Sequence, residues 1–246
     1  MKNFSLILST VAVILAVVAL VRANGGSNFG SGLTADKVAE AVQQNPEKIL
    51  QVFENYQQNK IKEAREAQEK AEREALAKYL PEINSDANAP SFGPKDAKVT
   101  VVEFFDFSCG YCKALAPSLE KVMADNAGVK FIFKPLSFVT PVSKYQAKAA
   151  YAANKQGKFL EFYKAVMAFN GRMSEADVDN VAKNIGLDMD QYKANVEAAD
   201  ISKSLDEVAA LASNAKINGV PTVFINGKKV QGMNPHEFQA AIDEIK

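Results

Sequence analysis

Cysteine and histidine, the usual ligands of structural zinc, are scarce in this chain. Among its 246 residues there are two cysteines, one histidine and no tryptophan. A structural zinc site needs four cysteine or imidazole ligands, and the single histidine, His236, lies far along the chain from the cysteines and is expected at the surface. We therefore expect no metal site and no bound cofactor.

An excess of charge of either sign is also missing. The 29 basic and 29 acidic residues cancel, so the formal net charge is zero. Binding of nucleic acid normally requires a basic face, so we expect no nucleic acid among the partners. The hydrophobic content of 48% is that of a globular protein with a substantial core.

The two cysteines lie in one motif, Cys-Gly-Tyr-Cys at 109–112. It follows the apolar run 99–107 and precedes the helix-like segment 113–123. A strand that delivers a Cys-x-x-Cys pair to a helix N-terminus is typical of thioredoxin-type redox sites. The helix dipole favours a thiolate on the first sulfur, so we assign Cys109 as the attacking thiolate and Cys112 as the resolving thiol. The alternative is a structural disulfide, but closing so small a loop would add little stability.

A second motif, Val220-Pro221, precedes a predicted β-hairpin. Proline cannot donate a hydrogen bond to a sheet, so its place at the entry to a central strand is unusual. In a thioredoxin-like fold this proline is cis and faces the dithiol. We expect a cis Val220–Pro221 bond that leaves the backbone of Val220 free to pair with an extended substrate peptide. The alternative is an ordinary trans proline at the start of a strand.

One carboxylate, Glu103, interrupts the apolar strand before the dithiol. A lone carboxylate there should be partly buried with a raised pKa, and it could accept the proton of Cys112 during exchange. The alternative is an edge position from which Glu103 reaches solvent. Three aromatic residues are expected to form an apolar rim around the dithiol, although some of them could equally be core: Phe105, Phe107 and Tyr111.

The N-terminus has the pattern of an export signal. Lys2 precedes a nearly continuous apolar run from Leu6 to Val21, so residues 1–23 are predicted to be a signal peptide. An uncleaved membrane anchor is the alternative, and residues 24–32 are expected to form a flexible leader. An exported chain with one cysteine pair in redox spacing suits an oxidising compartment.

Residues 33–80 are predicted to form a helical oligomerisation domain. A short helix is expected from Thr34 to Gln44 and a long one from Pro46 to about Leu80. An apolar stripe runs along both helices with no third element to cover it, which favours a homodimer or homotrimer. The alternative is packing of both helices on their own catalytic domain. The stripe consists of Val38, Val42, Ile49, Leu50, Val52, Phe53, Tyr56 and Ile61.

The remainder, after a linker over 81–90, is predicted to be an α/β domain over 91–246. Its expected elements are strands over 98–105 and 129–133, a helical block over 141–216, a hairpin over 222–231 with an Asn-Gly turn, and a final helix from 235. The dithiol helix lies between the first two strands. This order is that of a thioredoxin fold with a helical insertion.

The chain resembles DsbA-type thiol-disulfide oxidoreductases of the bacterial envelope over residues 91–246. The resemblance rests on the run Val-Val-Glu-Phe-Phe-Asp-Phe-Ser-Cys-Gly-Tyr-Cys-Lys, on the inserted helices and on Gly-Val-Pro-Thr-Val-Phe-Ile-Asn-Gly. With its N-terminal helices the whole chain is similar to an oligomeric subgroup that includes ScsC-type proteins, Com1-type proteins and the oligomeric DsbA homologues of Legionella-like bacteria. The resemblance implies catalytic roles for Cys109, Cys112 and Glu103, and substrate binding by Val220 and Pro221.

The resemblance also implies a periplasmic oxidoreductase or isomerase for unfolded or misoxidised exported proteins. Its redox partner would be a DsbB-like or DsbD-like membrane protein. Gly110 and Tyr111, expected beside the bound substrate, replace the Pro-His pair of the most oxidising members, so we expect a less oxidising disulfide. The alternative function is an oligomeric holdase chaperone with secondary redox activity.

Overall fold

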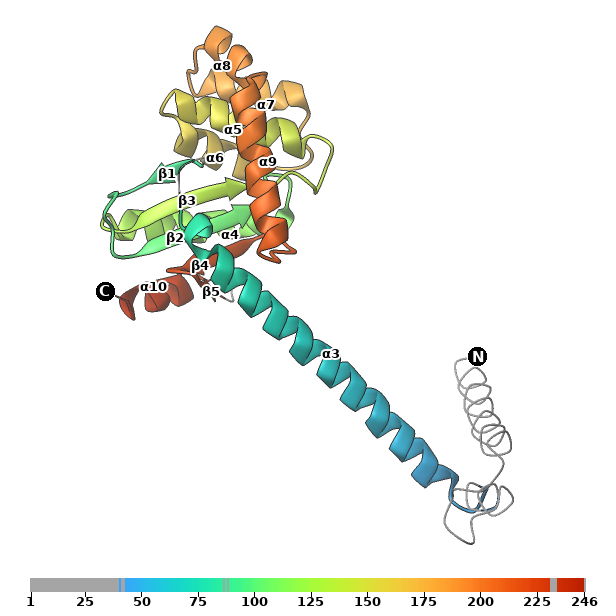
Figure 1. Ribbon diagram of the computed structural model, residues 1–246. Coiled ribbons are helices and arrows are strands. Elements are labelled where there is room, and N and C mark those ends of the chain that lie inside the picture. The colour runs from blue at the N-terminus through green and yellow to red at the C-terminus, as the bar shows by residue number, and fades with distance from the viewer. Residues whose placement is uncertain (1–39, 41–42, 86, 88, 231–233, 246) are drawn as a thin grey trace. The chain divides into compact units, whose positions relative to one another are not determined.

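The computed structural model describes residues 40, 43–85, 87, 89–230 and 234–245 (Figure 1). The expected signal peptide and leader lie outside the described residues, as does most of the helix expected from Thr34. None of the described helices is long and apolar enough to cross a membrane. The chain divides into two compact units, Met1–Glu69 and Lys70–Lys246, and each is described by itself.

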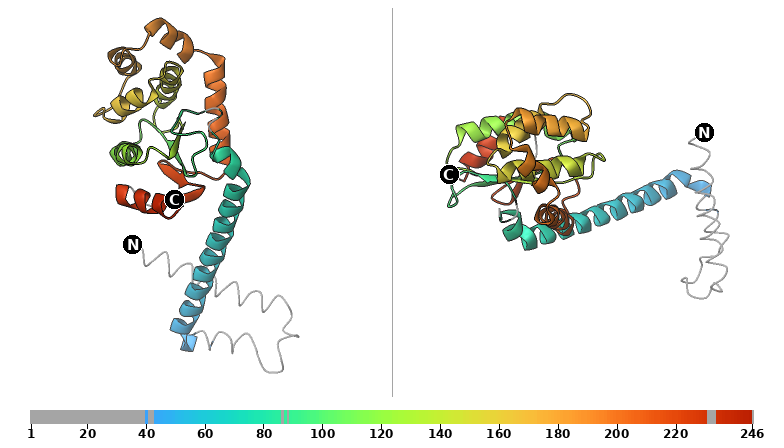
Figure 2. Two further views of the ribbon diagram at one scale, coloured as in Figure 1. Left: turned by 90° about the vertical axis from the view of Figure 1, so that its left-hand side faces the viewer. Right: turned by 90° about the horizontal axis from the view of Figure 1, so that it is seen from above.

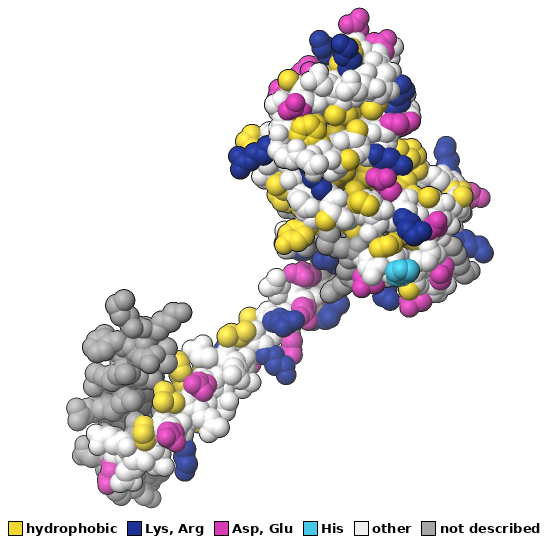
Figure 3. Space-filling model, turned by 180° about the vertical axis from the view of Figure 1, so that it is seen from behind, with side chains coloured by type: hydrophobic (Ala, Val, Ile, Leu, Met, Phe, Trp, Pro, Cys, Tyr) yellow, Lys and Arg dark blue, Asp and Glu magenta, His cyan; other side chains and the backbone are white. Residues whose placement is uncertain are grey.

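The helix α3 spans Pro46–Ile83. It begins at the proline predicted from the Asn-Pro start signal, and strong helix formers fill its middle. In the first unit it exposes the apolar side chains of Leu50, Val52, Phe53, Tyr56 and Ile61. Figure 3 shows hydrophobic side chains at intervals along the helix. The helix ends at Ile83 rather than near Leu80, with Pro81 inside its last turn.

The second unit is built on a five-stranded sheet. Its strands are β1 (Ser91–Phe92), β2 (Thr100–Phe105), β3 (Lys130–Pro135), β4 (Thr222–Ile225) and β5 (Lys228–Val230), in the order β1-β3-β2-β4-β5. The β2–β3 pair is parallel and the other pairs are antiparallel. The strands predicted from the sequence are present, and only the short β1 was not expected.

Two layers of helices cover the sheet, as the views in Figure 2 show. On one face lie α4 (Gly110–Asp125) and α10 (Pro235–Asp243), over buried residues such as Val101 and Phe105. On the other face, α9 (Ala199–Asn214) packs on Val102 and Phe104. Alternation along β2 separates the two faces, because successive side chains of a strand point to opposite sides.

The end of α3 belongs to the core under α9. Ile83 is fully buried and packs in one cluster with Phe104 and Phe224. The Asn226-Gly227 hairpin turn has both φ values positive, at 46° and 80°, as the predicted turn type requires. A Cβ on Gly227 would overlap the side chain of Leu80. Residues from Lys70 to Ile83 are therefore part of the second compact unit.

The predicted helical insertion lies between β3 and β4. It comprises α5 (Ser143–Lys155), α6 (Phe159–Met167), α7 (Glu175–Asn184), α8 (Met189–Val196) and α9. Ser174 forms a capping box at the start of α7 and Asp188 caps α8, as their residue types predict. The expected fold class, a thioredoxin fold with a helical insertion and a preceding helical segment, is confirmed.

Candidate active site

Cys109 lies at the N-cap of α4 with an extended backbone, at φ −78° and ψ 120°. Its carbonyl oxygen accepts the first helical hydrogen bond, from the Lys113 amide at 3.0 Å. The amides of the first helical turn have no partner within the helix, so the positive end of the dipole lies at this residue. Cys109 therefore occupies the helix N-terminus that the motif predicts.

Cys112 lies one turn further along and is fully buried, whereas Cys109 keeps 7% of its surface exposed. Both cysteines are free thiols in this structure. Burial raises the pKa of the Cys112 thiol, and the nearby charge of Glu103 adds to this effect. Cys112 therefore stays protonated until a base accepts its proton, which fits a resolving thiol.

The Val220–Pro221 peptide bond is cis, which confirms the expectation for this motif. The Sγ atom of Cys109 lies 3.6 Å from the carbonyl oxygen of Val220 and donates to it. The proline thus faces the dithiol from the loop that precedes β4. The alternative of a trans proline is wrong.

Glu103 is buried in the central strand β2, opposite Phe133 of β3 and Val223 of β4. Its Oε2 accepts a hydrogen bond of 3.0 Å from the hydroxyl of Tyr163, and its Oε1 has no partner among the described residues. Burial raises the pKa of Glu103 to about 8, although the Tyr163 hydrogen bond acts in the opposite direction. The expected burial and raised pKa are confirmed, and the solvent-reaching alternative is wrong.

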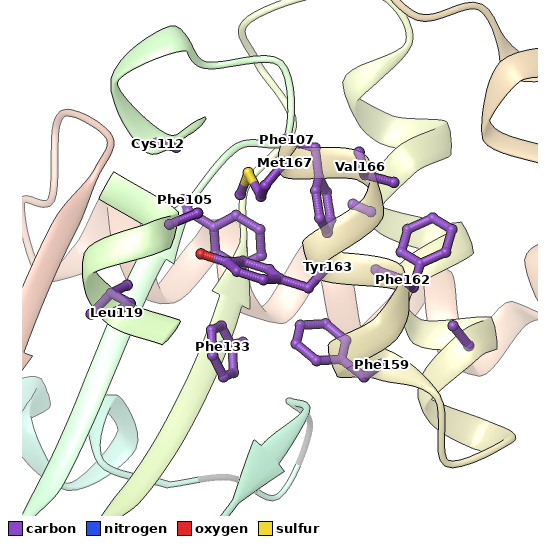
Figure 4. Packing of buried hydrophobic residues seen from close by; sticks show 14 of the residues in the cluster. Phe105, Phe107, Cys112, Leu119, Phe133, Phe159, Phe162, Tyr163, Val166 and Met167 are labelled. Atoms are coloured by element: carbon purple, nitrogen blue, oxygen red, sulfur yellow. The ribbon is translucent and has the colours of Figure 1, made fainter. Parts of the chain in front are cut away.

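Tyr163 is a site residue that the sequence does not reveal. It comes from α6 of the insertion, and Figure 4 shows it among Phe105, Phe133 and Phe159. The ring centroids lie 5.0 Å from Phe133 and 5.4 Å from Phe105. A tyrosine in an aromatic-rich amphipathic helix has the sequence signature of an ordinary core residue, so only the structure shows its contact with Glu103.

The expected aromatic rim is only partly correct. Tyr111 is 71% exposed beside the dithiol, and Gly110 is also exposed. Phe105 and Phe107 are instead fully buried, with their rings 4.9 Å apart. Both take part in the aromatic cluster around Tyr163, so the core alternative holds for these two and only Tyr111 remains in the rim.

A second buried carboxylate, Asp106, organises the backbone around the dithiol. Its Oδ1 accepts from the Ser108 amide and the Ser143 hydroxyl, both at 2.8 Å. Its Oδ2 accepts from the amides of Phe138 and Val139, at 3.0 and 3.1 Å. One side chain thereby fixes the loop before α5 against the loop that carries Cys109.

No group of three or more metal-ligating side chains occurs in the described part of the chain. His236, the only histidine, is exposed near the start of α10. The site is therefore built from a dithiol at a helix N-terminus, a cis proline and a buried acid on the adjacent strand. These features define a thioredoxin-fold protein with an insertion of the DsbA type.

Comparison with known proteins supports this class. A family model described as "Thioredoxin" matches residues 85–244, so the chain belongs to the thioredoxin family. A thioredoxin-like oxidoreductase from Silicibacter pomeroyi has 31% sequence identity and a TM-score of 0.61, covering 66% of this chain and 94% of that one. The catalytic domain of Proteus mirabilis ScsC has 27% identity and a TM-score of 0.62, covering 70% and 97%. The expected resemblance is confirmed.

Curated relatives include longer proteins. The Na(+)/H(+) antiporter NhaA 1 of Salinispora arenicola is 32% identical over 153 residues, which are 61% of this chain and 24% of the antiporter. The chain thus spans about a quarter of the length of that relative. The similarity concerns a segment that the antiporter shares with this chain.

Proposed function

We propose that this protein is a thiol-disulfide oxidoreductase, with disulfide isomerase capability, that acts on exported proteins. The observation that carries the proposal is the contact of Cys109 Sγ with the Val220 carbonyl at the cis proline. It brings together a sulfur at a helix N-terminus, on a residue that keeps 7% of its surface exposed, and a loop edge that can pair with an extended peptide. Cys112 and Glu103 are both buried, and Glu103 acts electrostatically on Cys112, so the two would supply resolution and proton transfer.

In the oxidising direction, a substrate thiolate attacks Cys109 of the enzyme disulfide. The Cys109–Cys112 bond breaks, a mixed disulfide forms, and Cys112 leaves as a thiolate. A second substrate thiolate then attacks the substrate sulfur of the mixed disulfide, which releases Cys109 as a thiolate stabilised by the helix N-terminus. The substrate gains a disulfide and the enzyme becomes a dithiol.

In the reducing or isomerising direction, the Cys109 thiolate attacks a substrate disulfide. The mixed disulfide is resolved either by another substrate thiol, which rearranges the pairing, or by Cys112. Glu103 takes the Cys112 proton in the second case and returns it in the oxidising direction. A pKa of about 8 suits both tasks near neutral pH, because a useful fraction of each protonation state is present.

Substrate binding is assigned to the surface around Cys109. The backbone of Val220 and Pro221 lies before the first residue of β4 and outside the sheet ladder. Gly110 leaves open space, since a Cβ there would meet no atom within 4 Å. The exposed ring of Tyr111 offers an apolar surface to an unfolded polypeptide.

The N-terminal helices are proposed to assemble a homodimer or homotrimer through residues 33–80. The support is the set of exposed apolar side chains on α3, which two or three copies could bury against one another. Several active sites in one assembly favour isomerisation, because one site can attack a wrong disulfide while another holds the chain. Sedimentation velocity on the mature protein tests the assembly, and a monomer at micromolar concentration would contradict it.

The site of action is proposed to be the periplasm, after removal of the signal peptide over 1–23. The partners would be unfolded or misoxidised exported proteins and a DsbB-like or DsbD-like membrane protein that sets the redox state. A holdase function is the second candidate, favoured by the same exposed side chains of α3. Cys109→Ser separates the two, because it abolishes exchange and leaves holdase activity intact.

The decisive experiment is reactivation of scrambled ribonuclease by the mature protein and by a variant that begins at Lys70. This boundary keeps Ile83 and the rest of the compact unit, which a start at Ser91 would remove. Reactivation by the longer protein alone would support an isomerase that needs its N-terminal helices. Oxidation of reduced ribonuclease without reactivation by either form would contradict isomerase capability and leave an oxidase. Failure of both forms in both reactions would contradict the proposed function.

A further inference from the structure

A cavity of about 420 Å³ adjoins the dithiol and has no role in the chemistry described so far. Ser108, which directly precedes Cys109, lines one side of it. Lys113 lines it as well and lies one helical turn beyond Cys109, with its amide bonded to the Cys109 carbonyl. Residues four apart on a helix are surface neighbours, so a polypeptide held at Cys109 reaches this cavity within a few residues.

The neutral polar groups of the cavity already bond to one another. The Thr140 hydroxyl donates to Ser108 Oγ, and Ser108 Oγ donates to Gln146 Oε1, both at 2.8 Å. Gln146 Nε2 in turn contacts Met173 Sδ at 3.5 Å. Asp106 holds the backbone beneath this chain of contacts. The floor of the cavity is therefore preorganised and offers few free donors or acceptors to a ligand.

The charged groups of the cavity are both cations. Lys113 and Arg172 line it, and no aspartate or glutamate does. Lys113 Nζ donates to the Phe169 carbonyl at 2.7 Å, which leaves two of its three N–H donors. Partial burial lowers the pKa of Lys113. Within the described residues neither Lys113 nor Arg172 forms an ion pair, so both cations lack an anionic partner.

We propose that this cavity binds an acidic side chain of the substrate polypeptide, a few residues from the cysteine that reacts with Cys109. The inference rests on the proposed oxidoreductase function and adds a substrate preference to it. Arg172 would contribute a planar pair of N–H donors suited to a carboxylate. Lys113 would contribute a second cation to the same cavity. Asp106 would not repel the ligand strongly, because four donors surround its carboxylate.

The test measures mixed-disulfide formation by the Cys112→Ser protein, which cannot resolve the product. The substrates are short peptides with one cysteine in a disulfide with 2-mercaptoethanol. Cys109 attacks the peptide sulfur, the peptide disulfide breaks, and 2-mercaptoethanol leaves as the thiolate. The peptides are made in pairs that differ at one position, where one member has glutamate and the other glutamine. The varied position is each of the three residues on either side of the cysteine in turn. Acid quenching and mass spectrometry give the rate for each pair.

At one or two positions the glutamate peptide should react about 3- to 10-fold faster than its glutamine counterpart, the range expected for one or two partly exposed ion pairs. The preference should fall in 0.5 M salt. Arg172→Gln combined with Lys113→Gln should reduce the glutamate-to-glutamine ratio to about 1, whereas Lys193→Gln, which removes a charge outside the cavity, should preserve it. The ratio isolates the binding of the carboxylate from any general change in the reactivity of Cys109.

Three results would overturn the inference. Equal rates for every glutamate and glutamine pair would show that the cavity has no preference for acidic side chains. A preference that survives Arg172→Gln combined with Lys113→Gln would place the recognition elsewhere. No mixed disulfide with any peptide would overturn the proposed function as well, so that result is distinguishable from the first two.

Discussion

Glu103 should make the fold lose stability as pH rises through the neutral range. Burial raises its pKa from 4.5 to about 8, so between these values the folded chain keeps a proton that the unfolded chain has released. The free energy of unfolding then falls by about 1.4 kcal/mol per pH unit. This contribution of Glu103 to the free energy of unfolding is fully present below pH 4.5 and is lost above pH 8, a total of roughly 5 kcal/mol.

The variant Glu103→Gln isolates this effect. Glutamine keeps the shape of the side chain and can still accept the hydrogen bond of Tyr163, but it does not titrate. From about pH 5.5 to 7.5 the wild type should lose about 3 kcal/mol more than the variant. Thiols and tyrosines of the unfolded chain remain protonated in this range. The assay is urea unfolding of the reduced proteins at equal concentration, followed by circular dichroism.

The exposed Glu161, on the same helix as Tyr163, provides the matched control. Glu161→Gln should keep the pH dependence of the wild type. Parallel stability curves for wild type and Glu103→Gln would refute the reasoning, because they would show that Glu103 does not retain its proton in the folded state.

Other perturbations test the remaining parts of the site and fold. Tyr163→Phe removes the hydrogen bond that lowers the pKa of Glu103. The pH midpoint for resolution of the mixed disulfide by Cys112, measured by rapid quench, should therefore move upward. An unchanged midpoint would contradict the role of Glu103 as the proton acceptor of Cys112. Cys112→Ser should accumulate mixed disulfides on non-reducing gels, and Cys109→Ser should not; the reverse pattern would exchange their roles. Gly93→Ala should cost about 2 kcal/mol or more in urea unfolding, because φ is 94° and a Cβ would overlap the Val129 carbonyl. Gly128→Ala, where a Cβ would meet no atom within 4 Å, should change stability little, and equal losses in the two variants would be inconsistent with this account.

Local signals in the sequence were sufficient for much of the fold. Ser174 and Asp188 cap helices through contacts with residues two or three positions away, so their residue types alone predict the helix starts. The Asn226-Gly227 turn is equally local, because its two positive φ values suit these residues. The Cys-x-x-Cys pair follows shortly after the end of a strand and lies at the start of a helix, so its position in the fold is also predicted from neighbouring residues.

The features that the sequence does not reveal depend on distant partners. The strand β1 has two residues, and it exists only because Ser91 and Phe92 pair across the sheet with β3. Tyr163 and Glu103 are 60 positions apart, and no periodicity identifies such a contact. Phe107 follows the end of β2, where sequence alone cannot separate a rim position from the aromatic cluster that buries it.

The hydrogen bond between Tyr163 and Glu103 has a consequence for the redesign of this fold. The insertion supplies the hydrogen-bond donor of an acid that belongs to the central sheet, so exchanging either part alone breaks this contact. A chimera that transplants this sheet into a protein with a shorter insertion would leave the Glu103 carboxyl without its donor in an apolar core. A redesign that preserves this contact must therefore carry α6 together with β2.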